Sequence, residues 1–135
     1  MYPDGVSVGI IDQRKLPFAF ETVTLRTTGD ACHAIREMLV RGAGCIGAVA
    51  AHGMFLAAQE AAEADDFDAA FQQKGDQLCK TRPTAMNLAW AVERSIAAVS
   101  AASDAAGKVE RAREVAIEVA DEDAEWCRKI GEHGR

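Results

Sequence analysis

The chain of 135 residues lacks an excess of basic residues, a long hydrophobic run and a paired cysteine motif. With 15 Lys and Arg against 21 Asp and Glu, its formal net charge is -6, which excludes a broad basic surface for nucleic acid or an anionic membrane. The most apolar stretch, 43–59, is built from Ala and Gly around His52. It is too short and too weakly hydrophobic to span a bilayer, so we predict a buried helix there.

The cysteines show neither a metal-binding nor a disulfide pattern. None forms a C-x-x-C pair, and none has a histidine at zinc-ligand spacing. Residues 1–5 carry no basic or apolar segment of the kind that directs export. We therefore predict reduced thiols, no metal site and a cytoplasmic location. The cysteines are Cys32, Cys45, Cys79 and Cys127.

Residues 6–26 favour extended structure. Residues 6–11 alternate and then run apolar, and residues 21–25 are rich in β-branched side chains. Between them, Pro17 cannot donate a ladder hydrogen bond and restricts Leu16 to extended conformations, so a connection is expected there. The pattern predicts a small antiparallel β element.

From residue 27 onward, apolar residues recur at helical spacing. Capping side chains at 27–30 start a first helix that should end near Val40, and Pro83 is suited to the first turn of a fourth. The remaining helices are expected at about 45–63 and 68–80 and from about 108 onward, with 100–107 as a connection.

These elements predict one domain over 1–135, with the β element at 6–26 and the helical part at 27–135. A content of 49% hydrophobic and 27% charged residues is typical of a packed globular protein of this length. The predicted class is α+β, mostly α: a small amino-terminal antiparallel β element followed by a bundle of about five helices.

Two predicted helix starts carry an arginine, in Arg41-Gly42-Ala43-Gly44 and in Arg82-Pro83-Thr84-Ala85. A helix amino terminus has unpaired N–H groups and a partial positive charge, and a guanidinium group can bind phosphate through two hydrogen bonds. Both starts could therefore face one phosphate. The alternative is that they are ordinary caps whose arginines pair with surface carboxylates.

Other candidate residues have simpler interpretations beside the functional one. Cys45 follows Arg41 by four positions, where a helix dipole and a cation would favour its thiolate, but a small core residue is the alternative. His33 and His52 have no partner at a diagnostic spacing, and we expect surface or core positions for them. Trp90 and Trp126 are expected to pack on helices, and the acidic run at 121–123 to be a solvated face.

Four segments, in order, resemble the amino-terminal half of the methylthioribose-1-phosphate isomerases. The likeness covers nearly the whole chain, and it extends more distantly to ribose-1,5-bisphosphate isomerase and to the alpha, beta and delta regulatory subunits of the translation-initiation exchange factor. The segments are 10–17 with Asp12-Gln13 and Leu16-Pro17, 34–48 with Arg41-Gly42-Ala43, 82–92 with Arg82-Pro83-Thr84-Ala85, and 122–134 with Ile130-Gly131-Glu132-His133-Gly134.

The resemblance implies an aldose–ketose isomerase of methionine salvage that converts 5-methylthioribose 1-phosphate to 5-methylthioribulose 1-phosphate without a cofactor. It further implies that Arg41, Gly42, Ala43 and Arg82 contact the substrate phosphate. One departure is Gly44-Cys45, where the family usually has Pro-Ala. A glycine there resembles the ribose-1,5-bisphosphate branch, which leaves the choice of sugar phosphate open.

The resemblance also implies that the family's catalytic cysteine and aspartate, in a carboxy-terminal domain, would lie after residue 135. A phosphate cradle alone binds without turnover, so whether the chain is active by itself stays open. The expected partners are a sugar phosphate and a complementing carboxy-terminal domain, or a second copy of the chain. The alternatives are a non-catalytic protein-binding module like the exchange-factor subunits and a gene fragment that self-associates through an uncovered apolar face.

Overall fold

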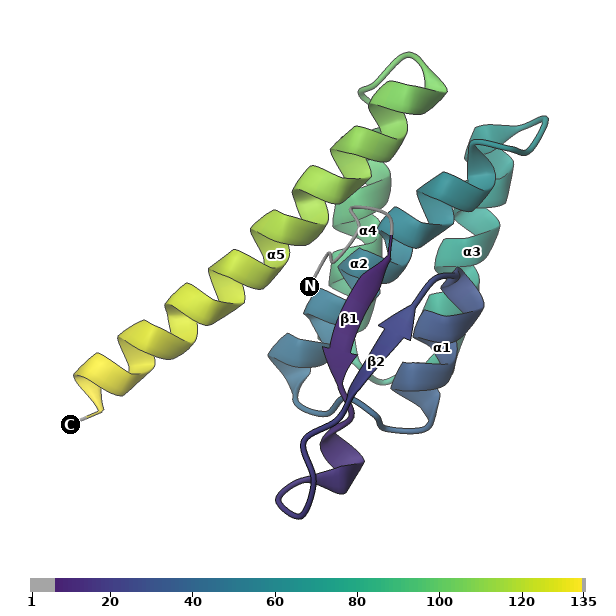
Figure 1. Ribbon diagram of the computed structural model, residues 1–135. Helices are drawn as coiled ribbons and strands as arrows, with labels where there is room; N and C mark the ends of the chain where they lie inside the picture. Colours follow the sequence, from purple (N-terminus) through teal and green to yellow (C-terminus); the bar gives the residue numbers. More distant parts are fainter. Residues whose placement is uncertain (1–6, 135) are drawn as a thin grey trace.

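The computed structural model describes residues 7–134. Within that range a two-stranded sheet precedes five helices, which confirms the predicted class, α+β and mostly α (Figure 1). Residues 1–6 and 135 lie outside the described residues, and with them the stretch 1–5 and the first residue of the predicted β element. The elements are β1 (Val8–Ile11), a 3-10 turn η1 (Gln13–Lys15), β2 (Thr22–Leu25), α1 (Thr28–Arg36), α2 (Ala43–Ala61), α3 (Phe67–Thr81), α4 (Met86–Val99) and α5 (Ala105–His133).

The two strands pair in the antiparallel sense, as predicted. Val8 lies opposite Leu25 and Ile11 opposite Thr22. Because side chains alternate between the faces of a strand, Val8, Ile10 and Leu25 enter the core while Ile11 is exposed. The hairpin therefore contributes one apolar face to the helical core.

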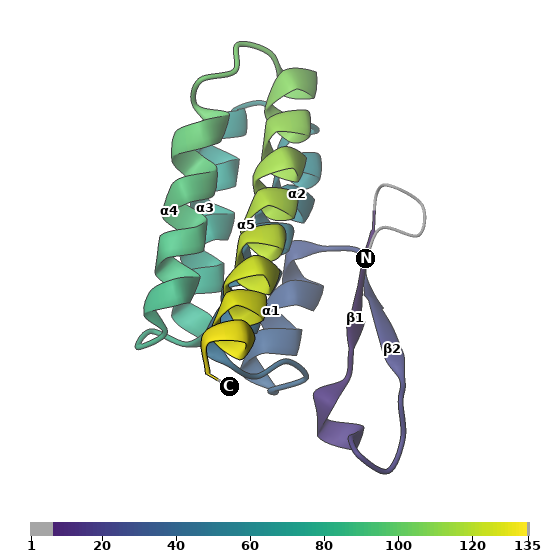
Figure 2. The same ribbon diagram turned by 90° about the vertical axis from the view of Figure 1, so that its left-hand side faces the viewer.

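α2 is the central helix of the bundle (Figures 1 and 2). It packs against α1, α3, α4 and α5, and it is buried all round from Ile46 to Ala58. This confirms the prediction of a buried helix in the most apolar stretch of the sequence. Its glycines permit the close packing: a Cβ atom on Gly53 would lie 3.0 Å from the Cβ atom of Ala31 and 3.2 Å from the methyl groups of Leu78.

α1 ends at Arg36, four residues before the predicted end near Val40. Met38 adopts a left-handed conformation with φ of 61°. The N–H of Leu39 then donates to the carbonyl of Ala34 at 2.9 Å, and the N–H of Met38 to that of Ile35 at 3.3 Å. This is the Schellman arrangement that ends many helices, here with Met at the position where glycine is usual.

Pro83 does not lie in the first turn of α4, so that prediction is wrong. The N–H of Ala85 donates to the carbonyl of Arg82 at 2.9 Å and closes a turn with Pro83 and Thr84 at its centre. Proline's fixed φ suits the second position of such a turn as well as it suits a helix start. Consequently Arg82 terminates α3, and α4 begins only at Met86.

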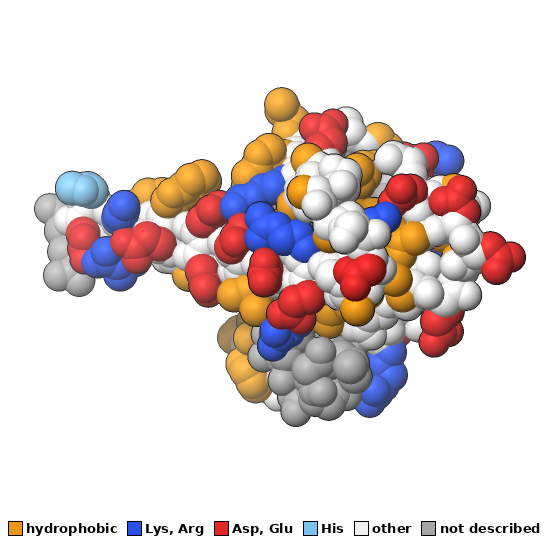
Figure 3. All heavy atoms as spheres, turned by 90° about the horizontal axis from the view of Figure 1, so that it is seen from above, with side chains coloured by type: hydrophobic (Ala, Val, Ile, Leu, Met, Phe, Trp, Pro, Cys, Tyr) orange, Lys and Arg blue, Asp and Glu red, His pale blue; other side chains and the backbone are white. Residues whose placement is uncertain are grey.

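α5 starts at Ala105, earlier than the expected residue 108, because the side chain of Asp104 accepts a hydrogen bond from the N–H of Gly107 at 3.0 Å. The second half of α5 projects from the bundle and carries exposed hydrophobic side chains (Figures 1 and 3). Acidic and basic side chains intermingle on the end of the bundle seen in Figure 3. No helix within residues 7–134 combines the length and apolar character that a bilayer crossing requires.

Candidate functional site

The amino ends of α2 and α4 lie at the same end of the bundle, because α3 returns the chain between them (Figures 1 and 2). Gly42 and Ala43 from the start of α2 line one hollow together with Ala85 and Met86 from the start of α4. Two helix dipoles therefore direct their positive ends to a single site.

Neither of these two helix starts has a side-chain cap. Their N-cap residues, Gly42 and Ala85, make no side-chain hydrogen bond to the first turn. In contrast, the side chains of Thr27, Asp66 and Asp104 cap α1, α3 and α5. The first-turn N–H groups of α2 and α4 thus remain available to an anion.

The hollow has a volume of about 340 Å³, and none of its lining residues is acidic. Arg82, Thr84 and Asn87 are among its lining residues, and their guanidinium, hydroxyl and amide groups can donate hydrogen bonds. Such a set of donors and positive charge suits a phosphate group. The lining residues are Gly42, Ala43, Ile46, Arg82, Thr84, Ala85, Met86 and Asn87.

Three of the four predicted site residues, Gly42, Ala43 and Arg82, line this hollow, and Arg41 does not. Arg41 is exposed just before it. Gly42 has φ of 95°, a conformation that favours glycine. Neither Arg41 nor Arg82 forms an ion pair with a carboxylate of residues 7–134, so the alternative of arginines paired to surface acids is not found.

Gln13 holds the turn before α2 in place through hydrogen bonds, a role that the sequence did not predict. Its backbone N–H donates to the carbonyl of Leu39 at 2.8 Å, and its Oε1 accepts from the N–H of Arg41 at 3.2 Å. Its Nε2 donates to the Sγ of Cys45 at 3.4 Å. The only signal in the sequence is its place in the Asp12-Gln13 motif, because partners about 30 positions away leave no periodic pattern.

A buried carboxylate holds η1, and with it Gln13, in place. Asp12 is only 2% exposed, and Arg14 donates from Nε to Oδ1 at 3.0 Å and from Nη2 to Oδ2 at 2.9 Å. The N–H of Arg14 also donates to Oδ1 at 3.1 Å. Hydrogen bonding to Arg14 holds the pKa of Asp12 below its usual value, so the carboxylate is charged at neutral pH.

The structure gives Cys45 and the histidines no direct part in the hollow. Burial raises the pKa of the Cys45 thiol, which agrees with the interpretation of Cys45 as a small core residue and not with an activated thiolate. His52 is buried, its Nδ1 donates to the carbonyl of Ala48 at 2.7 Å, and burial lowers its pKa. His33 lies exposed on α1. None of the three lines the hollow.

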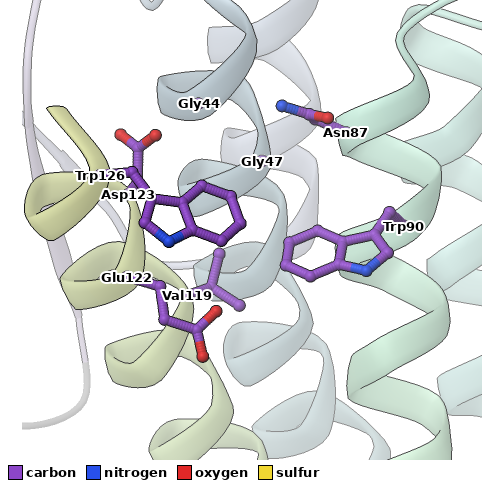
Figure 4. A pocket seen from close by; sticks show the side chains of 8 residues that line it. All are labelled: Gly44, Gly47, Asn87, Trp90, Val119, Glu122, Asp123 and Trp126. Atoms are coloured by element: carbon purple, nitrogen blue, oxygen red, sulfur yellow. The ribbon is translucent and has the colours of Figure 1, made fainter. Parts of the chain in front are cut away.

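A second hollow, of about 290 Å³, adjoins the first between α2, α4 and α5 (Figure 4). Asn87 lines both. The indoles of Trp90 and Trp126 face one another across it, and they are 44% and 60% exposed, so the expectation that they are helix-packing residues is corrected. The lining residues are Gly44, Gly47, Asn87, Trp90, Val119, Glu122, Asp123 and Trp126.

The acidic run at 121–123 is not simply a solvated face. Glu122 accepts hydrogen bonds from Arg94 at 2.7 and 2.9 Å, which joins α5 to α4 and holds the pKa of Glu122 below its usual value. Asp123 lies against the start of α2, where a Cβ atom on Gly44 would overlap its carboxylate. Gly44, which has no side chain, thus makes room for Asp123.

Comparisons with known proteins agree with this architecture. The model of the Initiation factor 2 subunit family matches residues 39–135. Methylthioribose-1-phosphate isomerases from Methylorubrum extorquens and Rhodospirillum centenum are 46% and 47% identical to the chain over 131 residues. Each match covers 97% of this chain and 34% of the relative, so the chain spans about a third of the length of these relatives.

Two solved structures share the fold. The translation initiation factor eIF-2B subunit delta from A. fulgidus superimposes with a TM-score of 0.87 and 37% identity over 93% of this chain and 38% of that one. The 5-methylthioribose 1-phosphate isomerase from Pyrococcus horikoshii gives 0.79 and 32% over 88% and 35%. Because the family model matches well over half of its residues, the chain belongs to the Initiation factor 2 subunit family.

Proposed function

We propose that the chain is the substrate-phosphate-binding domain of an aldose–ketose isomerase that converts 5-methylthioribose 1-phosphate to 5-methylthioribulose 1-phosphate. The observation that carries the proposal is the hollow where two uncapped helix starts meet Arg82 without a carboxylate. The isomerase names of the relatives support the substrate. A phosphorylated sugar as substrate accords with the predicted cytoplasmic location.

The phosphate would be bound by three kinds of group. The first-turn N–H groups of α2 and α4 donate to its oxygens, the guanidinium of Arg82 neutralises charge through a two-pronged hydrogen bond, and Arg41 adds positive potential from the rim. Gly42 lets the ligand approach the backbone because it has no side chain. Binding of this kind fixes one end of the sugar and so orients its reacting carbons.

Isomerisation also moves a proton between adjacent carbons, which requires an acid or base within hydrogen-bond reach. None of the eight residues lining the phosphate hollow has a side chain that exchanges a proton near neutral pH. We propose that a carboxy-terminal domain, corresponding to the part of the relatives that this chain does not span, supplies these groups. We therefore propose that domain as a partner of the chain.

Calorimetric titration with 5-methylthioribose 1-phosphate tests the proposal. We expect Arg82→Ala to weaken binding by about 1.5 to 3 kcal/mol, because it removes hydrogen bonds between charged groups. Arg41→Ala should have a smaller effect, since its side chain lies outside the hollow. Arg111→Ala is the matched control, because this arginine pairs with Glu114 on α5 away from the hollow. Unchanged affinity in both the Arg41 and Arg82 variants would remove the claim.

A second candidate is a non-catalytic module that binds a protein partner. The observation that favours it is the similarity to the eIF-2B delta subunit, with a TM-score of 0.87. The exposed hydrophobic side chains on the projecting half of α5, Trp126 and Ile130, offer a surface for such a partner. Two results together would favour this candidate. The chain would bind no sugar phosphate, and its complex with a defined protein partner would survive the double substitution of Arg41 and Arg82.

A further inference from the structure

The hollow between α4 and α5 continues from the phosphate hollow. Asn87, in the first turn of α4, lines both, and Gly44 follows Ala43 directly at the start of α2. A ligand whose phosphate lies at Arg82 therefore has a second hollow within reach, on the side of α5 (Figure 4).

The walls of this second hollow are largely apolar. The indoles of Trp90 and Trp126 form two sides, Val119 lies between them, and Gly47 contributes no side chain (Figure 4). The two indoles are 44% and 60% exposed, so part of each ring is open to a ligand. Aromatic rings make favourable contacts with thioether sulfur as well as with methyl groups, so the hollow suits a small sulfur-containing group.

Charge distinguishes the two hollows. Glu122 and Asp123 bring two carboxylates to the second hollow, and the guanidinium of Arg94, which pairs with Glu122, lies 5.3 Å from the centre of the Trp90 ring. No Lys or Arg is among the eight residues that line it. A second phosphate placed here would face the Asp123 carboxylate, while the guanidinium of Arg94 is already engaged by Glu122, which disfavours binding of that phosphate.

We propose that the hollow between Trp90 and Trp126 takes the uncharged methylthio end of the ligand and that the Asp123 carboxylate selects against a bisphosphorylated sugar. The inference rests on the proposed function, since it assumes that a phosphate occupies the hollow at Arg82. The proposal also bears on which sugar phosphate the chain binds, a choice that Gly44 left open in the sequence. This glycine accommodates Asp123, and Asp123 repels the second phosphate of a ribose 1,5-bisphosphate.

Three ligands separate the contributions of the first phosphate, the methylthio group and a second phosphate to the binding affinity. They are ribose 1-phosphate, 5-methylthioribose 1-phosphate and ribose 1,5-bisphosphate. Each is titrated into the 135-residue chain, and binding is followed by calorimetry and by tryptophan emission. The chain has two tryptophans, and both line this hollow, so their emission reports on it. We expect the methylthio ligand to bind about tenfold more tightly than ribose 1-phosphate, because it buries two further apolar groups, and to shift the emission. The bisphosphate should bind no more tightly than ribose 1-phosphate.

Trp126→Ala should reduce the tenfold preference to about threefold or less while leaving the affinity for ribose 1-phosphate unchanged. Trp126→Phe should retain most of the preference because it keeps an aromatic wall. Ile130→Ala is the matched control, because Ile130 is 71% exposed on the next turn of α5 and does not line the hollow. Thermal melts followed by circular dichroism verify that each variant folds.

The two levels of the proposal fail in different ways. Equal affinities for the methylthio ligand and ribose 1-phosphate, a preference that survives Trp126→Ala, or tighter binding of the bisphosphate would overturn this inference alone. Absence of binding of all three ligands, or binding that Arg82→Ala does not weaken, would overturn the proposed function and this inference with it.

Discussion

The two ends of the helical bundle differ in how the unpaired N–H groups of their helix starts are capped. At one end, α3 and α5 begin with aspartates whose side chains accept hydrogen bonds from first-turn N–H groups. At the other, α2 and α4 begin at Gly42 and Ala85 and have no such bond. Since a missing cap costs about 1 kcal/mol of stability, the difference marks the second end as the one where a bound anion can take the place of a cap.

The largest effect is expected when a capping side chain is introduced at the end of the bundle where α2 and α4 begin. Ala85→Asp should add about 1 kcal/mol to the free energy of unfolding, because Ala85 already has the extended conformation of an N-cap residue. It should also weaken sugar-phosphate binding by about 2 to 3 kcal/mol, since a carboxylate would then occupy the site. Ala85→Ser, which caps without charge, should weaken binding less. Equal binding by the Asp variant and the unaltered chain would show that this end is not an anion site.

Packing, rather than capping, should hold α2. Gly53→Ala is expected to lower the free energy of unfolding by about 2 kcal/mol relative to Gly131→Ala, because both variants gain helix propensity but only the methyl group at position 53 would crowd Ala31 and Leu78. Urea unfolding measures the change. Gly131→Ala is the control, because its Cβ atom would meet no other atom within 4 Å, and it should cause no loss. Equal stability of the Gly53 and Gly131 variants would contradict the close packing of α2 against α1 and α3.

Removing the caps at the end where α3 and α5 begin should reduce the stability of the fold and leave sugar-phosphate binding unchanged. Asp66→Ala and Asp104→Ala should each lower the free energy of unfolding by about 1 kcal/mol, since each leaves a first-turn N–H group without its partner. Affinity for the sugar phosphate should stay the same, because neither residue lines the phosphate hollow. A loss of affinity in either variant would mean that the two ends are not independent.

The smallest effect is expected from acid acting on the hairpin. The pKa of Asp12 is lowered in the folded chain, so its stabilising contribution is complete above the ordinary value of about 3.9 and is lost as the pH falls towards the lowered one. The difference in unfolding free energy between the unaltered chain and Asp12→Asn should therefore be constant above about pH 5 and shrink below pH 4. A constant difference down to pH 2 would contradict the ion pair with Arg14.

Most of the fold could be predicted because its signals are local. β-Branched alternation located the hairpin, and helical spacing located the helices to within a few residues. The end of α1 was missed because it depends on Met38 in a left-handed conformation, which residue type alone does not indicate. Pro83 was misplaced because its fixed φ suits a turn and a helix start equally.

The candidate site could be predicted in part. Helix direction and the two arginine-bearing segments were enough to bring Gly42, Ala43 and Arg82 to one hollow, while their contact with phosphate stays a prediction. Gln13 and the Trp126 wall could not be predicted. Their positions depend on contacts between residues far apart in the chain, and local periodicity carries no information on those.

The attachment of Gln13 to the turn before α2 makes the hairpin and the ligand site a single thermodynamic unit. A ligand that binds only when the 37–42 turn is in place must also favour the hairpin that holds it, by the reciprocity of linked equilibria. Saturating sugar phosphate should accordingly slow amide hydrogen exchange in β1 and β2, although neither strand lines the phosphate hollow.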